Sequence, residues 1–352
     1  MRRFLAFRRA DVSDRRQGES CRRPSRGLVV LVVFAALGLS YQTKGGEEEQ
    51  RPSRGVAMRI VSLAPSVTEI LFGIDAGDTL VGVSSFCDYP AEVATIPRVG
   101  TFTKPSIEAI LAARPDLVIA ARGPATMNAV ASVRGVGVPV LVIEDVKLAD
   151  VWKAIEDIGT HTGRVEAAAR LADQMRRRFD AVRSRLAGVP RRRVLVVVGQ
   201  TPLIVAGVET FVDDLICVAG GVNVAADTGQ PWPRLSLETV LSRAPEVIID
   251  SALSHEDGAD AGFWSRFPTL PAVRDGRVHA YRSFAALRGG PRLADAAEEF
   301  ARLIHPERYG ATDGEAENET STAGPEQPPT PARATGITRS RSQAQGEALG
   351  EQ

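Results

Sequence analysis

Short apolar runs rich in Val, Ile and Leu alternate with helical patterns across residues 58–310. Each run has the length of a buried strand, and each helical pattern is long enough to cross back over a sheet. The alternation predicts parallel βαβ units in two series along the chain. The first series has strands at 59–64, 80–84, 117–121 and 138–143 and helices at 66–74, 106–114 and 126–134, and the second has strands at 193–198, 203–206, 247–250 and 278–281 and helices at 211–219, 237–243 and 292–303.

One long helical pattern, at 163–187, lies between the two series. Its apolar residues recur at spacings of three and four, with Arg, Asp and Gln between them, which indicates an amphipathic helix with a narrow apolar seam. At about 1.5 Å per residue this helix would be roughly 37 Å long. A flexible linker would instead be rich in Gly and Ser. We therefore predict an N-terminal α/β lobe at 58–162 and a C-terminal α/β lobe at 190–310, joined by a rigid backbone helix within 163–189.

The segment 1–57 is not predicted to belong to either lobe. Residues 1–26 are rich in Arg, and the apolar run 28–39 would span only roughly 18 Å as a helix, against about 30 Å for the hydrocarbon core of a bilayer. These features are typical of a secretory signal followed by a linker, with residues 38–40 as the candidate cleavage site. An uncleaved N-terminal anchor is one alternative, and a true start at Met58 is the other.

The segment 311–352 consists mainly of small and polar residues. It has no aromatic residue and no valine, and Ile337 and Leu349 are its only large aliphatic residues. Such a segment cannot bury enough apolar surface to offset the conformational entropy lost on folding. We predict that it is a disordered tail.

Charge and motif content favour a binding protein over an enzyme or a nucleic-acid-binding protein. Lys+Arg and Asp+Glu are 43 each, so the chain has no basic field with which to release the counterions of a nucleic acid. Three cysteines without a CxxC pair exclude a scaffold built on disulfides. The sequence contains no HExxH, P-loop or GxSxG motif and no complete dinucleotide fingerprint. We predict neither a catalytic set nor a metal site.

Aromatic residues are only 5% of the chain, so the places where they gather are informative. Several of them follow predicted strands, and ligands of α/β sheets bind beyond the carboxyl ends of strands, so we expect these loops to face a cleft between the lobes. Trp232 lies between two prolines, which holds its ring stiffly and suits stacking on a flat ligand. Covering the edge of the core is the alternative role for Tyr89 and Trp232. The candidate ligand-binding residues are Pro65, Ser66, Phe86, Asp88, Tyr89, Trp232, Phe284 and Arg288.

The first of these positions also carry a helix-start signal. Ser66-Val-Thr-Glu69 after Pro65 matches a capping box, in which the serine would cap the helix and the glutamate would reach back to it. The pattern predicts a helix N-terminus at the edge of the cleft. Capping is the main role that it indicates, and free N–H groups there would also suit ligand carbonyls.

Two stretches of the sequence, 106–120 and 236–250, echo each other. Ser, Glu, Leu, Pro and Ile coincide between them. Any helix-turn-strand unit would explain the apolar spacing and the Pro stop, but not the shared acid at the third position. Glu108 and Glu238 are thus predicted in the first turns of equivalent helices, where the helix dipole favours a carboxylate. A role in stability and a role in recognition both fit these acids.

Several of these stretches resemble the vitamin B12-binding periplasmic proteins, a branch of the iron-siderophore, haem and cobalamin substrate-binding family of ABC importers. The similarity spans about 59–305. Asp-Tyr-Pro at 88–90 combined with Pro-Trp-Pro at 231–233 is specific to the cobalamin branch, whereas the other stretches mark only the wider family. Those other stretches are 59–71, 82–87, 97–100 and 106–120.

The resemblance implies two α/β lobes, each with a central, mainly parallel sheet flanked by helices, joined by one long rigid helix as in helical-backbone metal receptors and chelatase-like proteins. It implies that Tyr89 and Trp232 line a corrin cleft, that Arg288 is a cleft-side arginine, and that Glu108 and Glu238 dock onto arginines of a membrane permease. The chain would then be a periplasmic or exported monomer. It would capture a corrinoid such as cobalamin and deliver it to an ABC permease dimer with its ATPase, with no covalent cofactor and no nucleic-acid partner.

The sequence departs from the best-known cobalamin binders at Ala121 and Val198, where those proteins carry aromatic residues. Fewer stacking surfaces leave the identity of the corrinoid open. One alternative keeps the protein class and changes the ligand to haem or a ferric siderophore. The other is a cytosolic, chelatase-like or cofactor-handling enzyme that begins at Met58.

Overall fold

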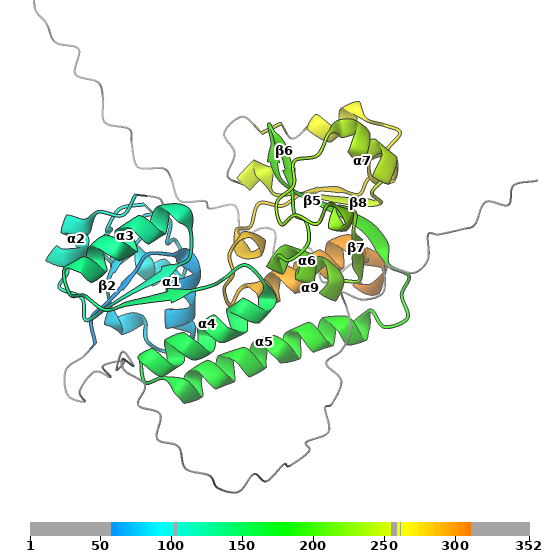
Figure 1. Ribbon diagram of the computed structural model, residues 1–352. Coiled ribbons are helices and arrows are strands. Elements are labelled where there is room, and N and C mark those ends of the chain that lie inside the picture. Colours follow the sequence, from blue (N-terminus) through cyan, green and yellow to red (C-terminus); the bar gives the residue numbers. More distant parts are fainter. Residues whose placement is uncertain (1–57, 102–103, 255–258, 261, 311–352) are drawn as a thin grey trace, which may run out of the picture. The chain divides into compact units, whose positions relative to one another are not determined.

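The computed structural model describes residues 58–101, 104–254, 259–260 and 262–310 (Figure 1). The predicted signal or anchor segment and the predicted tail lie outside the described residues. The predicted fold class is confirmed, because the described part contains two sheets of mainly parallel strands flanked by helices. The predicted lobe boundaries stay predictions. Among the described helices, none combines the length and apolar character needed to cross a bilayer.

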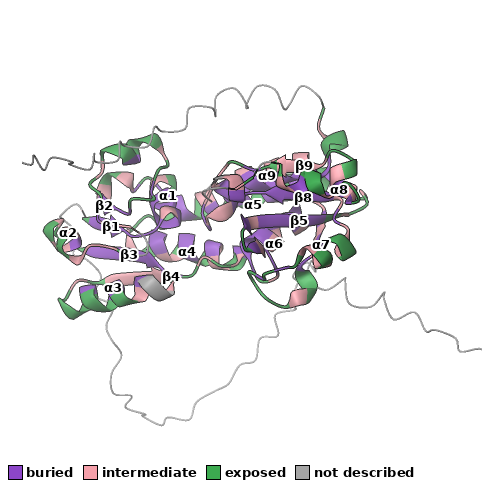
Figure 2. Ribbon diagram, turned by 90° about the horizontal axis from the view of Figure 1, so that it is seen from above, coloured by how far each residue is buried: buried purple, intermediate pink, exposed green. Residues whose placement is uncertain are grey.

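The first sheet contains four parallel strands. Its strands are β1 (Ile60–Ser62), β2 (Leu80–Val83), β3 (Leu117–Ala121) and β4 (Val140–Ile143), and its helices are α1 (Pro65–Gly73), α2 (Ile107–Ala112) and α3 (Pro124–Gly135). The order of the strands is β2-β1-β3-β4. Ile110 of α2 and Val133 of α3 pack with Val61 and Val118 of the strands, so these helices cover one face (Figure 2).

The second sheet has five strands and contains both parallel and antiparallel pairs. Its strands are β5 (Arg192–Gln200), β6 (Leu203–Val205), β7 (Gly221–Asn223), β8 (Val247–Asp250) and β9 (Val278–Ala280), and its helices are α6 (Phe211–Val218), α7 (Leu237–Arg243), α8 (Pro271–Arg274) and α9 (Leu293–Ile304). The order is β6-β5-β8-β9, and β7 pairs with the first residues of β5 on the same edge as β6. Neither β7 nor α8 is predicted by the sequence patterns.

The strand β6 corrects one expectation. The sequence pattern predicts a strand of a parallel βαβ unit at 203–206, but β6 pairs antiparallel with β5. Only Thr201 and Pro202 separate the two strands, and a connection that short can form a hairpin but not the crossover that parallel neighbours need. The other strands of this sheet that pair with β5 or β8 are parallel to them.

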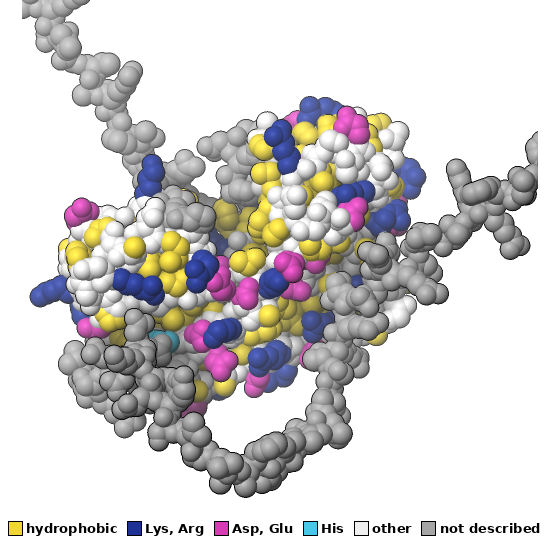
Figure 3. Space-filling view, in the orientation of Figure 1, with side chains coloured by type: hydrophobic (Ala, Val, Ile, Leu, Met, Phe, Trp, Pro, Cys, Tyr) yellow, Lys and Arg dark blue, Asp and Glu magenta, His cyan; other side chains and the backbone are white. Residues whose placement is uncertain are grey.

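The predicted rigid helix is α5 (Val165–Arg185), and a second helix, α4 (Leu148–His161), lies against it. The helix α4 is not among the elements predicted from the sequence. The apolar seam of α5 is buried against α4 and α9 and includes Met175 and Phe179. Its outer side is charged, and Figure 3 shows Lys and Arg interspersed with Asp and Glu over this helix. Arg178 links α5 to α9 through ion pairs with Asp295 at 2.6 Å and Glu298 at 2.8 Å.

Gly159 allows α4 and α5 to approach closely. A Cβ atom at this position would lie 2.4 Å from the Cβ of Ala168 on α5, which is closer than two carbon atoms can come without a shift of the backbone. The two helices can therefore pack at this point only because one of them presents a bare backbone. This packing holds α5 close against α4.

The echo between 106–120 and 236–250 is also present in the structure. The Oγ atom of Ser106 accepts the Ala109 N–H at 3.1 Å, and that of Ser236 accepts the Thr239 N–H at 3.2 Å. These serines are the N-caps of α2 and α7, and each satisfies an N–H group that the helix itself leaves free.

The turns that follow α2 and α7 match as well. The carboxylate of Asp116 accepts the backbone N–H of Arg59 at 2.8 Å, and the carboxylate of Glu246 accepts that of Arg193 at 2.8 Å. In both cases the acid at the entry to one strand binds the backbone at the entry to its neighbour. The same helix-turn-strand unit therefore occurs once in each sheet.

Candidate functional site

The loop that follows β2 presents two aromatic rings at the carboxyl edge of the first sheet. Phe86 is 53% exposed and Tyr89 is 47% exposed, whereas Cys87 between them is buried. The Arg98 guanidinium donates to the Cys87 carbonyl at 2.7 Å, and the Thr68 hydroxyl donates to the Cys87 Sγ at 3.2 Å. Burial raises the pKa of Cys87, so its thiol stays protonated at neutral pH. The loop is thus held from below while its rings face outward.

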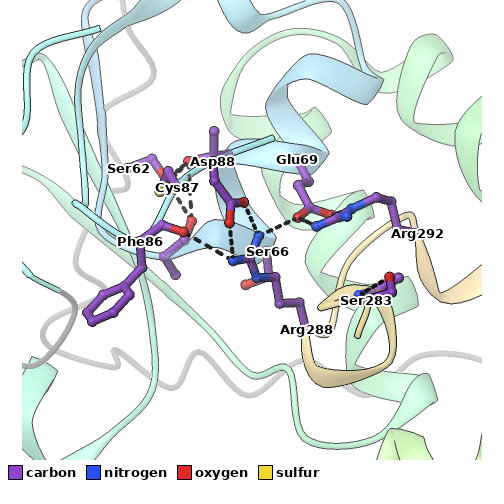
Figure 4. A network of polar contacts seen from close by, with 12 residues as sticks. Ser62, Ser66, Glu69, Phe86, Cys87, Asp88, Ser283, Arg288 and Arg292 are labelled. Atoms are coloured by element: carbon purple, nitrogen blue, oxygen red, sulfur yellow. Dashed lines mark hydrogen bonds and ion pairs between the residues drawn. The ribbon is translucent and has the colours of Figure 1, made fainter. Parts of the chain in front are cut away.

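A segment from the second half of the chain, residues 284–292, contacts this loop and the start of α1. Arg288 lies in it with only 11% of its side chain exposed. Its guanidinium makes two hydrogen bonds to the Asp88 carboxylate, one of them between Nη2 and Oδ2 at 2.9 Å, and donates to the Phe86 carbonyl at 3.3 Å (Figure 4). The same guanidinium lies 4.9 Å from the ring centre of Phe284, which is half-buried. Arg288 therefore joins the two halves of the chain.

Arg292 makes a second connection four residues further along. It donates to both oxygens of Glu69, from Nε at 3.0 Å and from Nη2 at 2.6 Å, and its Cζ lies 4.3 Å from the centre of the Tyr89 ring. Burial opposes the charged form of Arg292, but the hydrogen bonds and charge of Glu69 and the charge of Asp88 raise its pKa. Glu69, whose side chain is 2% exposed, also lies 3.4 Å from Arg288.

The capping box predicted at 66–69 is wrong. The N-cap of α1 is Ala64, Pro65 is the first helical residue, and no side chain caps the helix. The helix begins earlier than the pattern suggested because Pro is well suited to its first position. Ser66 is buried and donates to Asp145 Oδ2 at 2.9 Å, and Glu69 pairs with the arginines instead.

Backbone from the same segment covers the first turn of α1. A Cβ atom at Gly289 would lie 2.6 Å from the Asp145 carbonyl, and one at Gly290 would lie 3.5 Å from the Cα of Ser66. Burial raises the pKa of Asp145, opposed by its hydrogen bond from Ser66. The chain's own backbone therefore lies where the sequence analysis expected N–H groups available to a ligand.

Trp232 is the exposed aromatic residue of the second half, with 43% of its surface accessible. The carbonyl groups of the prolines on both sides of it accept backbone hydrogen bonds. Gly207 N–H donates to the Pro231 carbonyl at 2.8 Å, and Val205 N–H donates to the Pro233 carbonyl at 3.1 Å. The ring is therefore carried on a short segment that is bonded at both ends, to the last residue of β6 and to Gly207 just after it.

The candidate residues fall into two groups. Phe86, Asp88, Tyr89, Phe284 and Arg288 are joined directly or through Arg292. No contact described for residues 58–310 joins Trp232 to them. A hollow of about 310 Å³ is lined by Tyr89, Arg292 and residues of α5, and a second, of about 340 Å³, lies along α5. Neither hollow is lined by Trp232.

The buried partners of this network are residues that the sequence analysis did not place in a site. The sequence pattern places Glu69 in a capping box and Arg292 at the start of a helix. A weak signal was available, since Arg288 and Arg292 are four residues apart just before an amphipathic helix. A second buried polar cluster lies at the ends of β5 and β8, where Asp250 Oδ2 accepts hydrogen bonds from Gln200 Nε2 at 2.9 Å and from Trp264 Nε1 at 2.7 Å.

Glu108 and Glu238 occupy the same place on their two helices. Each is exposed in the first turn, of α2 and α7 respectively. The N–H of Glu108 and the hydroxyl of Ser106 lower the pKa of Glu108, and the Ser236 hydroxyl, followed by the N–H of Glu238, lowers the pKa of Glu238. Both side chains are therefore ionised at neutral pH and present equivalent negative charges.

Comparison with known proteins gives the same result for sequence and for fold. Residues 60–284 match the family described as periplasmic binding protein. A vitamin B12-binding protein of Yersinia pestis (strain Pestoides F) is 28% identical over 215 residues, which cover 61% of this chain and 77% of that relative.

Two solved structures show the similarity of fold. The periplasmic vitamin B12-binding protein of Vibrio cholerae superposes with a TM-score of 0.62 and 29% identity, over 72% of this chain and 99% of that one. The periplasmic haem-binding protein of Roseiflexus sp. RS-1, in its apo form, has a TM-score of 0.62 and 31% identity, over 71% of this chain and 100% of that one. Proteins named for two different tetrapyrrole ligands are thus similar to this chain to the same degree.

Proposed function

Since the chain belongs to the periplasmic binding protein family, we propose that it is the substrate-binding component of an ABC importer and that its ligand is a corrinoid such as cobalamin. The resemblance inferred from the sequence is confirmed at the level of the family. Members of this family bind substrates, and we propose that this chain likewise has no enzymatic activity, covalent cofactor or resident metal. Its relatives are periplasmic, and we propose that residues 1–57 direct export.

The observation that carries the proposal is the set of exposed rings on stiff loops. Phe86 and Tyr89, after β2, and Trp232, in the segment bonded to the end of β6, expose 53%, 47% and 43% of their surfaces. Large rings exposed to this degree leave apolar surface in contact with water, which is unfavourable unless a ligand covers them. Hydrogen bonds hold the backbone on which they stand, so little ordering would be needed on binding. A flat macrocycle with an apolar face and a polar rim is the ligand that suits such rings.

The test is a titration of the full chain with cyanocobalamin, dicyanocobinamide and haemin, in which binding is monitored by absorbance and by calorimetry. We expect the corrinoids to bind more tightly than haemin. Tighter binding of haemin would instead support the haem binder, which the similarity to the Roseiflexus protein favours. Binding of neither class, in a folded protein, would contradict the proposal. A ferric siderophore is the remaining ligand of this family, and it would be added to the same titration.

The Trp232→Ala variant tests whether this ring takes part in binding. Loss of one stacking face is expected to weaken corrinoid binding about 30-fold, which corresponds to roughly 2 kcal/mol. Leu241→Ala on α7 is the matched control, because it removes another exposed apolar side chain from the same half of the chain. Equal affinity of the Trp232→Ala variant and the unmodified protein would remove Trp232 from the site.

For the permease, we propose that Glu108 and Glu238 are the docking residues. The two acids are exposed, ionised and placed on equivalent helices. A permease dimer presents the same basic surface twice, and two equivalent acids on a monomer are complementary to it.

A further inference from the structure

The positive charges beneath the aromatic rings are already neutralised by the protein. Arg288 pairs with Asp88 and Arg292 pairs with Glu69, so these four side chains have no net charge together. A ligand that approaches Phe86 and Tyr89 therefore meets two guanidinium groups that are already paired with carboxylates of the protein. This balance matters because an arginine with free N–H groups is the usual partner of a ligand carboxylate.

The two ion pairs differ in how they face the solvent. The Glu69 side chain is 2% exposed and lies behind its arginines, which makes it part of the interior. The Asp88 side chain is 46% exposed and the Arg288 side chain only 11%, so the carboxylate is the member of that pair that an incoming ligand reaches first. Asp88 also stands in the sequence between the exposed rings of Phe86 and Tyr89.

The charge of Asp88 is permanent at neutral pH. Burial alone would raise its pKa, but the hydrogen bonds and charge of Arg288, with the charge of Arg292, lower it below the ordinary value. The carboxylate therefore stays ionised, and the Arg288 guanidinium stays engaged, throughout the range of pH in which a transport protein works.

We propose that Asp88 determines the charge preference of this site: by occupying the guanidinium of Arg288 it excludes ligands with carboxylates on their rim and favours ligands with amides. The inference rests on the proposed function, and it assigns to a single side chain the choice between haem, whose rim carries propionates, and a corrinoid, whose rim carries amides. A propionate would have to displace Asp88 and leave that carboxylate beside a second negative charge. An amide requires no such exchange, so the exclusion acts through repulsion as well as through lost attraction.

Two variants break the same ion pair and are expected to act in opposite directions. Asp88→Asn keeps the shape of the side chain and releases a positive guanidinium, so the affinity for haemin relative to dicyanocobinamide should rise about tenfold, the effect of roughly one charge-assisted hydrogen bond. Arg288→Gln leaves Asp88 unpaired and negative, so the same ratio should fall. A pair that served only to hold the loop in place would shift the ratio in the same direction in both variants.

The measurement is the ratio of the two dissociation constants in the full chain, from calorimetric titrations of each variant, with circular dichroism melts to confirm folding. The double variant Asp88→Asn with Arg288→Gln should return the ratio toward that of the unmodified protein, since no charge remains unbalanced. Asp275→Asn is the control, because it removes the charge of an acid paired with Arg274 outside the site.

An unchanged ratio in Asp88→Asn, or a shift in the same direction in both single variants, would overturn the inference and leave the proposed function standing. Binding of neither ligand to the unmodified protein would overturn the proposed function and this inference with it. The two failures are distinguishable, because the first occurs in a protein that binds its ligand and the second in one that does not.

Discussion

Replacing Glu69 with alanine should destabilise the folded protein by about 3 kcal/mol, because removing one member of a buried ion pair leaves its partner charged and unpaired. The Glu69 carboxylate is 2% exposed and accepts hydrogen bonds from Arg292 at 2.6 and 3.0 Å. Arg288 would keep Asp88, but Arg292 would lose its hydrogen-bonded carboxylate and retain the charge of Asp88 and the Tyr89 ring. The free energy of unfolding, measured by urea titration of the full chain, gives the effect.

Glu298→Ala is the matched control for this prediction. Glu298 also pairs with an arginine, Arg178, but its side chain is 31% exposed and Arg178 retains a second acid, Asp295. Solvent screens such a pair, so its loss should cost less than about 1 kcal/mol. Similar losses in the two variants would show that Glu69 stabilises the fold no more than a surface acid does. Glu69→Gln, which keeps the shape and one acceptor, should fall between them.

Reversing the charges of Glu108 and Glu238 together should abolish uptake of the ligand by cells while the affinity of the purified protein for that ligand is unchanged. Both acids are exposed in the first turns of α2 and α7, away from the network around Arg288. A basic permease surface that attracts them would repel the arginines of the double variant. Uptake of labelled cobalamin into cells and titration of the purified variant are the paired measurements.

The control for charge reversal is the double variant Glu156→Arg with Glu166→Arg. These acids are also exposed and helical, and Glu166 likewise lies in the first turn of its helix, α5. The net charge of the control therefore equals that of the test variant. Uptake that persists in the test variant would refute the docking proposal, and uptake lost in both variants would mean that net charge rather than position matters.

Local sequence patterns predicted most of the secondary structure. Apart from β7, the strands of both sheets follow from apolar runs, and the helix α5 follows from spacings of three and four. The helix α4 was missed although its signal was present, since Leu148, Val151, Ile155 and Ile158 recur at spacings of three, four and three. The strand β6 was assigned to the right residues, but its direction depends on the length of the turn before it rather than on its own sequence.

The candidate site was less accessible to sequence reasoning because its polar contacts join residues far apart in the chain. Arg292 and Glu69 are 223 positions apart, and Arg288 and Asp88 are 200 apart. The sequence around each acid gives no sign of the arginine with which it pairs. The residues before Glu69 instead match a capping motif, which is why the sequence pattern predicts that role. Exposed aromatic residues beside strand ends could be named from the sequence, whereas the buried charges behind them could be identified only once the fold had brought them together.

The two sheets belong to one compact unit that ends at Arg308. A fragment that contained only the first sheet would carry Glu69 without Arg292, and one that contained only the second would carry Arg288 and Arg292 without their acids. Each fragment would also expose apolar side chains of α5 or α9. Although the same helix-turn-strand unit occurs in both, we expect neither half to be stable alone, so a gene split between them would have to supply both products to one compartment.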